Sequence, residues 1–419
     1  MRRRTRGAFL NLLLFIGALS FIFYLNGTGS GGGGSGSSRP AENSFAWSTI
    51  RYRSTSTTLP EARGICPSLA ADQHGHRASK PALVVARVTA DGDTKWLDAL
   101  KDKYHLCVYT ADKPLDKKST YLQVPANRGH EAMAYLTFLI DNYAHLPAAG
   151  AVFIHGSRWA WHNDMPDYDN AAALAALNVS AALAPTGYHN LRCDWSASTC
   201  PTSSTSEQVV AQGSLSNSIR AMLEPWNQRV VSDAALPHAL ATLFGGNDYS
   251  SSASNAARVL LARNDAVRSQ CCAQFVVSRE RIWQHSRDEY VALRQWLLDG
   301  SDADTEGGGE GGSHPASNNI GAAAPADDRI AGRILSYLWH ILFIRPCNDS
   351  AEGSSCAGDD GLLDLDRLNT LACPSAAECY CRLYGRCNLQ GCTSPGSCQG
   401  QYMVPPHFRL PDDWAATHL

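Results

Sequence analysis

Short apolar runs recur along the middle of the chain, and each is followed by a more polar or amphipathic stretch. Four runs typical of buried strands lie at residues 82–88, 105–109, 121–124 and 151–155. Between the last two, Met133, Leu136 and Ile140 recur at helical spacing, which predicts a helix that begins within residues 127–131. This alternation of strands and helices predicts a single α/β domain with a mixed, mostly parallel sheet.

The pattern resumes at Cys271. Residues 271–277 (Cys-Cys-Ala-Gln-Phe-Val-Val) form a short apolar run, and Ser-Arg-Glu follows as the start of a helix. We expect a buried strand that places polar groups at the start of a helix, and α/β enzymes commonly have their catalytic residues at such strand-to-helix junctions. Ser286 and Glu289 form a capping box for the next helix, and residues 329–344 predict an apolar core helix.

The first 25 residues have a different composition. A basic cluster at residues 2–6 precedes an apolar run over residues 8–25, which is just long enough to span a bilayer. The basic flank places residues 1–7 in the cytoplasm and the bulk of the chain on the other side. A cleaved signal peptide is the alternative, but bulky residues 21–25 (Phe-Ile-Phe-Tyr-Leu) stand where a cleavage site needs small ones. We therefore expect a type II membrane protein.

Composition then divides the rest of the chain. Residues 26–80, rich in Gly, Ser and Thr, predict a flexible stem. The lumenal α/β domain is expected over residues 81–345, with a low-complexity, disordered insertion at residues 302–327. Residues 346–419 hold eight cysteines and predict a disulfide-rich C-terminal appendix.

Cysteine usage agrees with an oxidising lumen. Fourteen cysteines, an even number, favour disulfides, and the alternative of a zinc site lacks paired Cys-x-x-Cys ligands. Cys193 and Cys200 lie close together in the sequence, and we expect them to bond each other. Adjacent Cys271 and Cys272 are expected to have distant partners or to be buried and free.

Charge and sequons bear on partners and modification. A net charge of −3 gives no basic field, so no nucleic-acid partner is expected. Sequons at Asn178 and Asn348 are candidate glycosylation sites, whereas Asn26 lies too close to the membrane.

The junction at residues 127–131 (Asn-Arg-Gly-His-Glu) is a first candidate site. Asn127 can cap the helix, Gly129 allows close approach of the backbone, and free N–H groups there attract phosphate. Arg128 would add positive charge, and Glu131 could act on a sugar or a metal. The alternative is an ordinary capped helix with a stabilising acid in its first turn, and spacing alone favours it.

The segment at residues 155–164, which leaves the end of a predicted strand, is a second candidate site. Ligands bind outside the carboxyl ends of strands in open α/β sheets. His155, His162 and Asp164 suit a divalent cation, and Trp161 offers a face to a sugar ring. The alternative is a surface loop with stacked tryptophans, but the functional interpretation is favoured.

Other motifs are interpreted as structural or are absent from the sequence. Asp91-Gly92-Asp93 matches the Asp-x-Asp of metal-dependent sugar-nucleotide transferases, but we interpret it as an acidic turn. His340, on an apolar helix, is interpreted as a core residue. No Gly-x-Ser-x-Gly, His-Glu-x-x-His or P-loop signature occurs, which argues against the common hydrolases and NTPases.

Taken in order, several segments resemble a largely fungal family of unassigned function, the domain of unknown function 3431 family. They lie at residues 83–87, 127–132, 135–143, 152–156, 161–163, 187–193, 271–281 and 332–340. The resemblance covers about residues 82–390. Many members have a Glu where this chain has Ser336, which argues against a catalytic role at that position.

That family is in turn similar to glycosyltransferases with a Rossmann-like nucleotide-sugar domain, the glycosyltransferase A-like fold. The similarity implies a nucleotide sugar across the strand ends and a divalent metal, manganese or magnesium, as cofactor. The residues expected to contact substrate are Asn127, Arg128, Gly129, Trp161, Gln274 and Arg279. Glu131 and Glu280 are the candidate bases for an acceptor hydroxyl.

The leading hypothesis is therefore a glycosyltransferase-like enzyme of the Golgi or ER lumen, or of the cell surface, acting on a glycan or glycoprotein acceptor. One alternative is a non-catalytic protein that binds glycans or a partner on a degenerate transferase fold. Another is a metal-dependent hydrolase built on His155, His162 and Asp164. The enzyme hypothesis requires the segments around Gly129, His162 and Gln274 to meet at one edge of a common sheet.

Overall fold

The computed structural model describes residues 15–17, 44–54, 64–70, 80–113, 118–164, 168–201, 211–247, 258–302, 323–345 and 362–398. Residues 1–42 and 43–419 form separate compact units. In the first unit residues 15–17 are described and are helical, so the predicted tail and most of the predicted anchor at residues 8–25 lie outside the described residues. Among the described residues, no helix has the length and apolar character needed to cross a bilayer.

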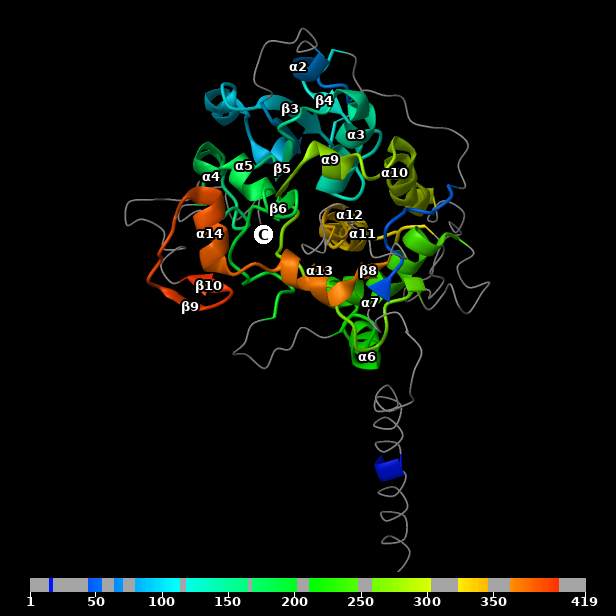
Figure 1. The fold of residues 1–419 in the computed structure, drawn as a ribbon. Coiled ribbons are helices and arrows are strands. Elements are labelled where there is room, and N and C mark those ends of the chain that lie inside the picture. Colours follow the sequence, from blue (N-terminus) through cyan, green and yellow to red (C-terminus); the bar gives the residue numbers. More distant parts are fainter. Residues whose placement is uncertain are drawn as a thin grey trace, which may run out of the picture. The chain divides into compact units, whose positions relative to one another are not determined.

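A six-stranded sheet organises the second unit, in the order β4-β3-β2-β5-β7-β6 (Figure 1). Its strands are β2 Ala82–Arg87, β3 His105–Thr110, β4 Leu122–Gln123, β5 Ala151–His155, β6 Tyr188–Asn190 and β7 Phe275–Val277. Strands β4, β3, β2 and β5 are parallel, and β7 runs antiparallel to both of its neighbours, β5 and β6. The predicted α/β class with a mixed, mostly parallel sheet is confirmed.

Both faces of the sheet are buried. Successive residues of a strand point to opposite faces, so Val84 of β2 packs in one apolar cluster while Leu83 and Val85 pack in the other. Phe153 and Ile154 of β5 divide in the same way. Burial on both faces explains why these strands are continuous apolar runs rather than alternating ones.

Helices cover the two faces (Figure 1). One cluster includes residues of α3 Glu131–Asp141, α7 Gln228–Gly245, α10 Arg287–Asp302, α11 Asp328–Ser336, α12 Trp339–Phe343 and α13 Leu365–Ala372. The other includes residues of α4 Asn170–Ala176, α5 Val179–Leu183, α14 Ala376–Tyr384 and the 3-10 helix Lys95–Leu100. The remaining helices are α2 Pro67–Ala70, α6 Leu215–Leu223, α9 Arg279–Ile282 and the 3-10 turns Thr89–Asp91 and Tyr143–His145. Two further strand pairs are β1 Ser44–Phe45 with β8 Leu363–Asp364 and β9 Cys392–Ser394 with β10 Ser397–Cys398. The single helix predicted over residues 329–344 is thus two helices, α11 and α12.

Part of the predicted flexible stem is instead built into the core. Phe45, Trp47 and Tyr52 are buried in the cluster that contains α3 and α7. Cys66 is bonded to Cys107 of β3. The prediction was wrong for residues 44–54 and 64–70 because a few aromatic side chains among serines bury enough apolar surface to hold the segment.

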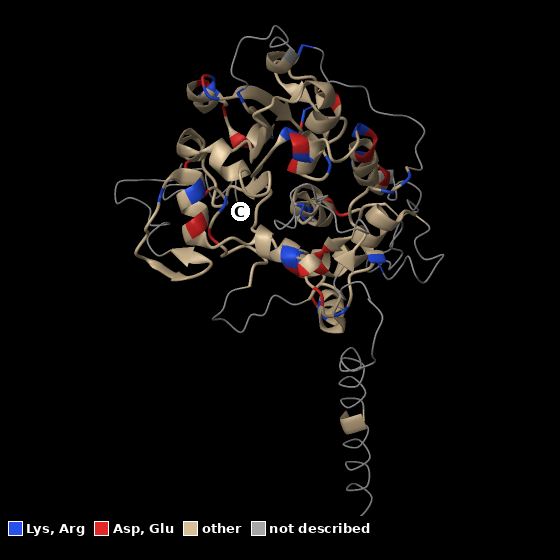
Figure 2. Ribbon diagram, in the orientation of Figure 1, with Lys and Arg blue, Asp and Glu red and all other residues tan. Residues whose placement is uncertain are grey.

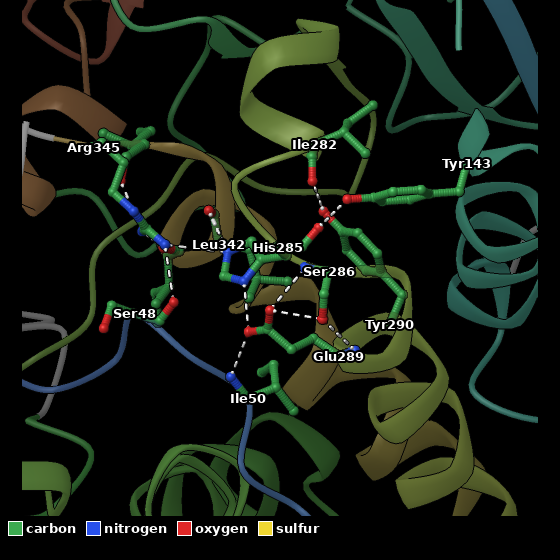
Figure 3. Close-up of polar contacts among 12 residues, drawn as sticks. Ser48, Ile50, Tyr143, Ile282, His285, Ser286, Glu289, Tyr290, Leu342 and Arg345 are labelled. Atoms are coloured by element: carbon green, nitrogen blue, oxygen red, sulfur yellow. Dashed lines mark hydrogen bonds and ion pairs between the residues drawn. The ribbon is translucent and has the colours of Figure 1, made fainter. Parts of the chain in front are cut away.

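A polar network fastens this N-terminal segment to α10 (Figure 3). One oxygen of Glu289 accepts hydrogen bonds from Ile50 N at 2.9 Å and from His285 Nδ1 at 3.1 Å. The other accepts from Ser286 N at 2.8 Å while Ser286 Oγ accepts from Glu289 N, so the predicted capping box is confirmed. Burial alone would raise the pKa of Glu289, but these hydrogen bonds outweigh it and lower the pKa to about 2.

Disulfides join distant parts of the second unit. The predicted bond between Cys193 and Cys200 is wrong, because Cys193 is bonded to Cys379 and Cys200 to Cys373. The other disulfides of the described residues are Cys66–Cys107, Cys271–Cys272, Cys381–Cys387 and Cys392–Cys398. The adjacent cysteines at 271 and 272 therefore bond each other, contrary to expectation.

The C-terminal segment belongs to the same compact unit as the sheet and is not an appendix. Leu368 of α13 lies in one apolar cluster and Tyr380 of α14 in the other. The end of the predicted disordered insertion is also part of the fold, since Ala324 N donates to Trp296 O at 3.1 Å. Residues 303–322 of that insertion lie outside the described residues.

Candidate functional site

A cleft of about 850 Å³ opens at the carboxyl end of β5. Its walls come from the start of α3, the loop after β5, the segment before β7, the turn into α7 and one side of α11. Residues 130–131, 155–162 and 271–273 all contribute to this lining. The three segments that the sequence singled out therefore meet at one edge of the sheet, as expected.

Gln274 joins two of these segments from behind. Its Oε1 accepts from His155 N at 3.3 Å and from Asn170 Nδ2 at 3.1 Å, and its Nε2 donates to Asn163 Oδ1 at 3.1 Å. The side chain is buried and is not among the residues that line the cleft. Gln274 thus supports the wall of the cleft, and the predicted substrate contact is not made from this position.

The predicted anion site at residues 127–131 is filled by the protein itself. Helix α3 begins at Glu131, so Asn127 is not its cap. Asp328 of α11 accepts a hydrogen bond from Gly129 N. Gly129 has φ 71°, and a Cβ there would lie 2.7 Å from the Leu297 side chain, so only glycine fits without strain. The turn therefore positions the residues that follow it and leaves no N–H group at Gly129 for a phosphate.

Arg128 also turns inward. Its guanidinium donates to the main-chain carbonyls of residues 297, 325 and 326 and lies 3.4 Å from the carboxylate of Asp328. The side chain is only 7 % exposed. Arg128 therefore clamps α3, α10 and the start of α11 together, and it does not face the cleft.

Glu131 and His155 form a pair on the cleft wall. His155 Nε2 lies 2.7 Å from the carbonyl oxygen of Cys272, which can only accept, so this nitrogen carries a proton. His155 Nδ1 is 4.0 Å from Glu131 Oε2. Behind them, the pKa of the Tyr135 hydroxyl is raised well above its usual value by burial and, to a smaller extent, by the charge of Glu131. Glu131 is 13 % exposed, which leaves it within reach of a ligand in the cleft.

Two tryptophans stand at the cleft. Trp161 is 44 % exposed, and its carbonyl accepts from Arg192 Nη1 at 2.7 Å. Trp226, before α7, is 76 % exposed and also lines the cleft. His162 lies next to Trp161 and places its ring centroid 4.3 Å from that of His155. The cleft thus offers aromatic faces of the kind that sugar rings and bases stack on.

The predicted metal site at His155, His162 and Asp164 is not assembled. Asp164 is buried, and its two oxygens accept from Tyr380 Oη at 2.9 Å and from Cys193 N. Within the described part of the chain, no group of three His, Cys, Asp or Glu side chains is arranged to hold a metal ion. Because both Asp164 oxygens are engaged and His155 donates to a carbonyl, these three residues do not fit a divalent cation.

Basic side chains dominate the cleft instead. Arg229, Arg329 and Arg333 line it together with three histidines, and Glu131 is the one acidic side chain among its described lining residues. Elsewhere the signs are mixed: Figure 2 shows basic and acidic residues side by side on α10, α13 and α14. The lining of the cleft is therefore more basic than these three helices.

Acids outside the cleft hold two of these arginines. Arg329 donates from Nε and Nη2 to Asp327, at 3.1 and 2.9 Å. Arg333 Nη2 donates to Tyr337 Oη at 3.2 Å, and Tyr337 donates to Asp233 at 2.6 Å. Burial raises the pKa of Asp233, although the Tyr337 hydrogen bond and nearby arginines oppose that rise. Both arginines project from α11 at i and i+4 spacing, which puts them on one side of the helix.

Arg279 and Glu280 lie away from the cleft. Because β7 is antiparallel to β5, the end of β7 reaches the amino end of β5, where a Cβ on Gly150 would lie 2.4 Å from Val277 O. Arg279 packs 4.6 Å from the Trp283 ring, and the Glu280 side chain is 64 % exposed. The predicted substrate-binding and catalytic roles of these two residues have no support from their position.

Three smaller predictions can be compared with the structure. Asn178 is exposed and caps α5, and Asn348 lies outside the described residues. In the Asp-x-Asp segment, Asp91 accepts from Val88 N at 2.8 Å and Asp93 from Lys95 N at 2.9 Å, so the turn interpretation is confirmed. His340 is fully buried, and burial lowers its pKa to about 3, as expected of a core residue.

The sequence did not point to several cleft residues. Arg229 and Trp226 carry no local signal, because their position depends on how α7 packs. Arg329 and Arg333 bracket Gly332 at helical spacing, which could have indicated a basic side of α11. The Cys271–Cys272 bond, whose residues also line the cleft, was not predicted from the sequence either.

Comparison with known proteins gives one match. The family described as "Protein of unknown function (DUF3431)" matches residues 83–382, which is more than half of the chain. The chain therefore belongs to the DUF3431 family. Neither the curated proteins nor the solved structures include a significant match to it.

Proposed function

We propose that this member of the DUF3431 family is a glycosyltransferase-like enzyme that binds a nucleotide sugar in the cleft at the end of β5. The observation that carries the proposal is the charge of the cleft, where Arg229, Arg329 and Arg333 accompany a single described carboxylate. Arginine forks match phosphate oxygens in both charge and geometry. A diphosphate is therefore the group that this lining suits best.

The position of the cleft also favours a nucleotide. Strands β4, β3, β2 and β5 follow one another in the spatial order that Rossmann-like sheets use for their first four strands. Such sheets bind ligands outside the carboxyl ends of the strands, at the point where the strand order reverses, which here lies between β2 and β5. The cleft borders this point at His155, the last residue of β5, and extends from there over the β7 side of the sheet, where Cys271, Cys272 and Ala273 line it.

Different cleft residues have different roles in the proposed group transfer. The acceptor hydroxyl oxygen attacks the anomeric carbon, and the bond from that carbon to the diphosphate breaks with its electron pair on the diphosphate. The three arginines stabilise that leaving group. Glu131 takes the hydroxyl proton, and His155, fixed by its bond to Cys272 O, stands beside it with Nδ1 4.0 Å from the carboxylate. We route no step through a metal, because the predicted ligands do not fit one.

We also propose that the second unit works in an oxidising lumen of the Golgi or ER, or at the cell surface, with residues 8–25 as anchor and the N-terminus cytoplasmic. The disulfides support this compartment, because Cys193–Cys379 and Cys200–Cys373 tie the C-terminal segment to the sheet. Alkaline carbonate extraction of membranes tests the proposed anchor. Release of the full chain into the soluble fraction would contradict it.

A thermal-shift screen of the full-length protein from an oxidising host tests nucleotide binding. A nucleotide at 100 times its dissociation constant should stabilise the protein by about 2.7 kcal/mol. Arg329→Gln should abolish most of this shift. Arg220→Gln is the matched control, because Arg220 is also an exposed, salt-bridged helix arginine, paired with Glu224 and outside the cleft. No shift with any UDP- or GDP-sugar, or equal losses in both variants, contradicts the proposal.

Turnover is tested separately from binding. Glu131→Gln keeps the shape of the side chain but removes the base, so the nucleotide-induced shift should persist while sugar transfer or hydrolysis falls by ~10²-fold or more. Glu280→Gln is the control, since its side chain lies away from the cleft and should leave both readouts unchanged.

A second function is favoured by the exposure of Trp161 and Trp226 at the cleft: binding of a glycan without chemistry. On this alternative, Glu131→Gln leaves glycan affinity unchanged, Trp161→Ala weakens it, and no nucleotide sugar is consumed. A glycan array read with these two variants separates the two functions.

A further inference from the structure

Helix α6 carries an apolar face that is open to solvent. Ile219, Met222 and Leu223 lie at helical spacing on α6 and are 41, 67 and 69 % exposed, and Trp226, in the turn after the helix, is 76 % exposed. Leu260, in a neighbouring segment, is 44 % exposed. We call these five residues the α6 face. Soluble proteins rarely leave large apolar side chains together in water, so such a face indicates a partner.

The α6 face lies where the N-terminal part of the chain enters the folded unit. Ala46 N donates to Arg258 O at 2.9 Å, and Trp47 Nε1 donates to Val259 O at 3.0 Å. Residues 258–262 continue to the start of α6, since a Cβ on Gly213 would lie 2.7 Å from Ala262 O. Residues 46–47 and Gly213, two residues before α6, therefore both lie against residues 258–262.

The short segment between the proposed anchor and residue 44 bears on which partner the α6 face can have. If residues 8–25 anchor the chain, the 18 residues at 26–43 can span at most about 60 Å before the described fold begins at residue 44. Basic residues accompany the apolar ones: Arg220 lies on α6, and Arg258 and Arg263 flank Leu260. Exposed apolar side chains, a tryptophan and nearby arginines are typical of elements that lie in a membrane interface.

We infer that the α6 face docks on the surface of the lipid bilayer that the proposed anchor spans. The inference rests on that anchor, which brings the face to the membrane, and is independent of the transferase chemistry. Trp226 belongs both to the α6 face and to the lining of the cleft. Docking therefore sets the cleft beside the lipid headgroups, where a membrane-bound acceptor can reach it.

Quenching of tryptophan emission by brominated lipid tests the docking with the full-length chain in proteoliposomes. We expect wild-type protein to lose emission when brominated lipid replaces ordinary lipid. Trp226→Phe should remove most of that loss, whereas Trp283→Phe, which changes another exposed tryptophan at 43 %, should leave it unchanged. Met222→Asp with Leu223→Asp should also remove most of the loss, because charge on the face opposes insertion.

Equal quenching in wild type and Trp226→Phe overturns the inference. So does quenching that the double aspartate variant leaves intact. A second copy of the chain on this face would shield Trp226 and give no lipid-dependent quenching, which overturns it as well. Carbonate extraction separates this failure from failure of the anchor: a chain that stays in the membrane without Trp226 quenching refutes docking alone.

Discussion

Removal of the two disulfides that hold the C-terminal segment should destabilise the protein more than the sum of the single removals. Cys193–Cys379 and Cys200–Cys373 are nested, with sequence separations of 186 and 173 residues. Each bridge shortens the loop that the other closes. The perturbation is Cys→Ala at both partners of one bridge, then of both bridges.

The magnitudes follow from loop lengths in the chain-entropy treatment. While one bridge is intact, the other closes only the 13 residues by which the two separations differ, and its loss costs about 3 kcal/mol. Once it is gone, the remaining bridge closes a loop of at least 173 residues, worth about 5 kcal/mol. Both removals together should therefore cost about 8 kcal/mol, against about 6 for the two single values added.

Denaturant unfolding at 25 °C under non-reducing conditions, followed by tryptophan fluorescence, gives these free energies. Because whole domains are stable by about 5–15 kcal/mol, the double removal should leave the protein largely unfolded. The control combines Cys193–Cys379 with Cys381–Cys387, whose loop lies outside the nested pair, and these two losses should add. A cooperatively folded double variant that loses no more than the sum of the single losses refutes the nested-loop argument.

Three further predictions concern local sites. The pKa of Glu289, which is 15 % exposed, is lowered to about 2, so its stabilising effect is present above the unfolded value of 4.5 and is lost as the pH falls toward 2. Urea unfolding at pH 6 and pH 3 should show a loss of about 2 kcal/mol in wild type that Glu289→Gln lacks, because part of the effect is still present at pH 3. Replacing Cys271 and Cys272 by Ser should cost less than about 1 kcal/mol, since their loop is minimal. It should lower sugar transfer or hydrolysis while the nucleotide-induced thermal shift persists, because Cys272 O holds His155 beside Glu131. Gln274→Leu removes the hydrogen-bond partner of Asn163 Oδ1 and of Asn170 Nδ2, both on buried side chains, so it should lower the unfolding free energy by about 2–4 kcal/mol. Denaturant titration measures this loss, and an unchanged unfolding free energy would show that Gln274 does not support the cleft wall.

Local pattern was sufficient for the elements that form the sheet. Residues 82–88, 105–109 and 151–155 were expected as strands because buried parallel strands are continuous apolar runs, and β2, β3 and β5 follow them closely. The Ser286–Glu289 capping box was equally readable, because capping depends on residues three apart. Such features are set within one element.

Several predictions failed because they depended on contacts with residues far away in the sequence. The carboxylate that occupies Gly129 N comes from Asp328, about 200 residues away, so the N-terminus of α3 looked free for a phosphate. Cys193 pairs with a cysteine 186 residues on, although Cys200 is close at hand. The stem prediction failed for the same reason, since Trp47 packs against Phe244 of α7 and donates to Val259 O, both about 200 residues away.

The direction of one strand accounts for most of the change in the candidate site. In a parallel β7, Ser278 and the helix after it would have stood at the carboxyl edge beside His155, and Arg279 and Glu280 would have faced the cleft. Because β7 is antiparallel to β5, its beginning arrives there instead, and it brings Gln274 and the Cys271–Cys272 bond. A three-residue apolar strand reads the same in either direction, so periodicity cannot fix its orientation. In the proposed mechanism the catalytic carboxylate is therefore assigned to Glu131 of α3, the acidic side chain among the described residues that line the cleft.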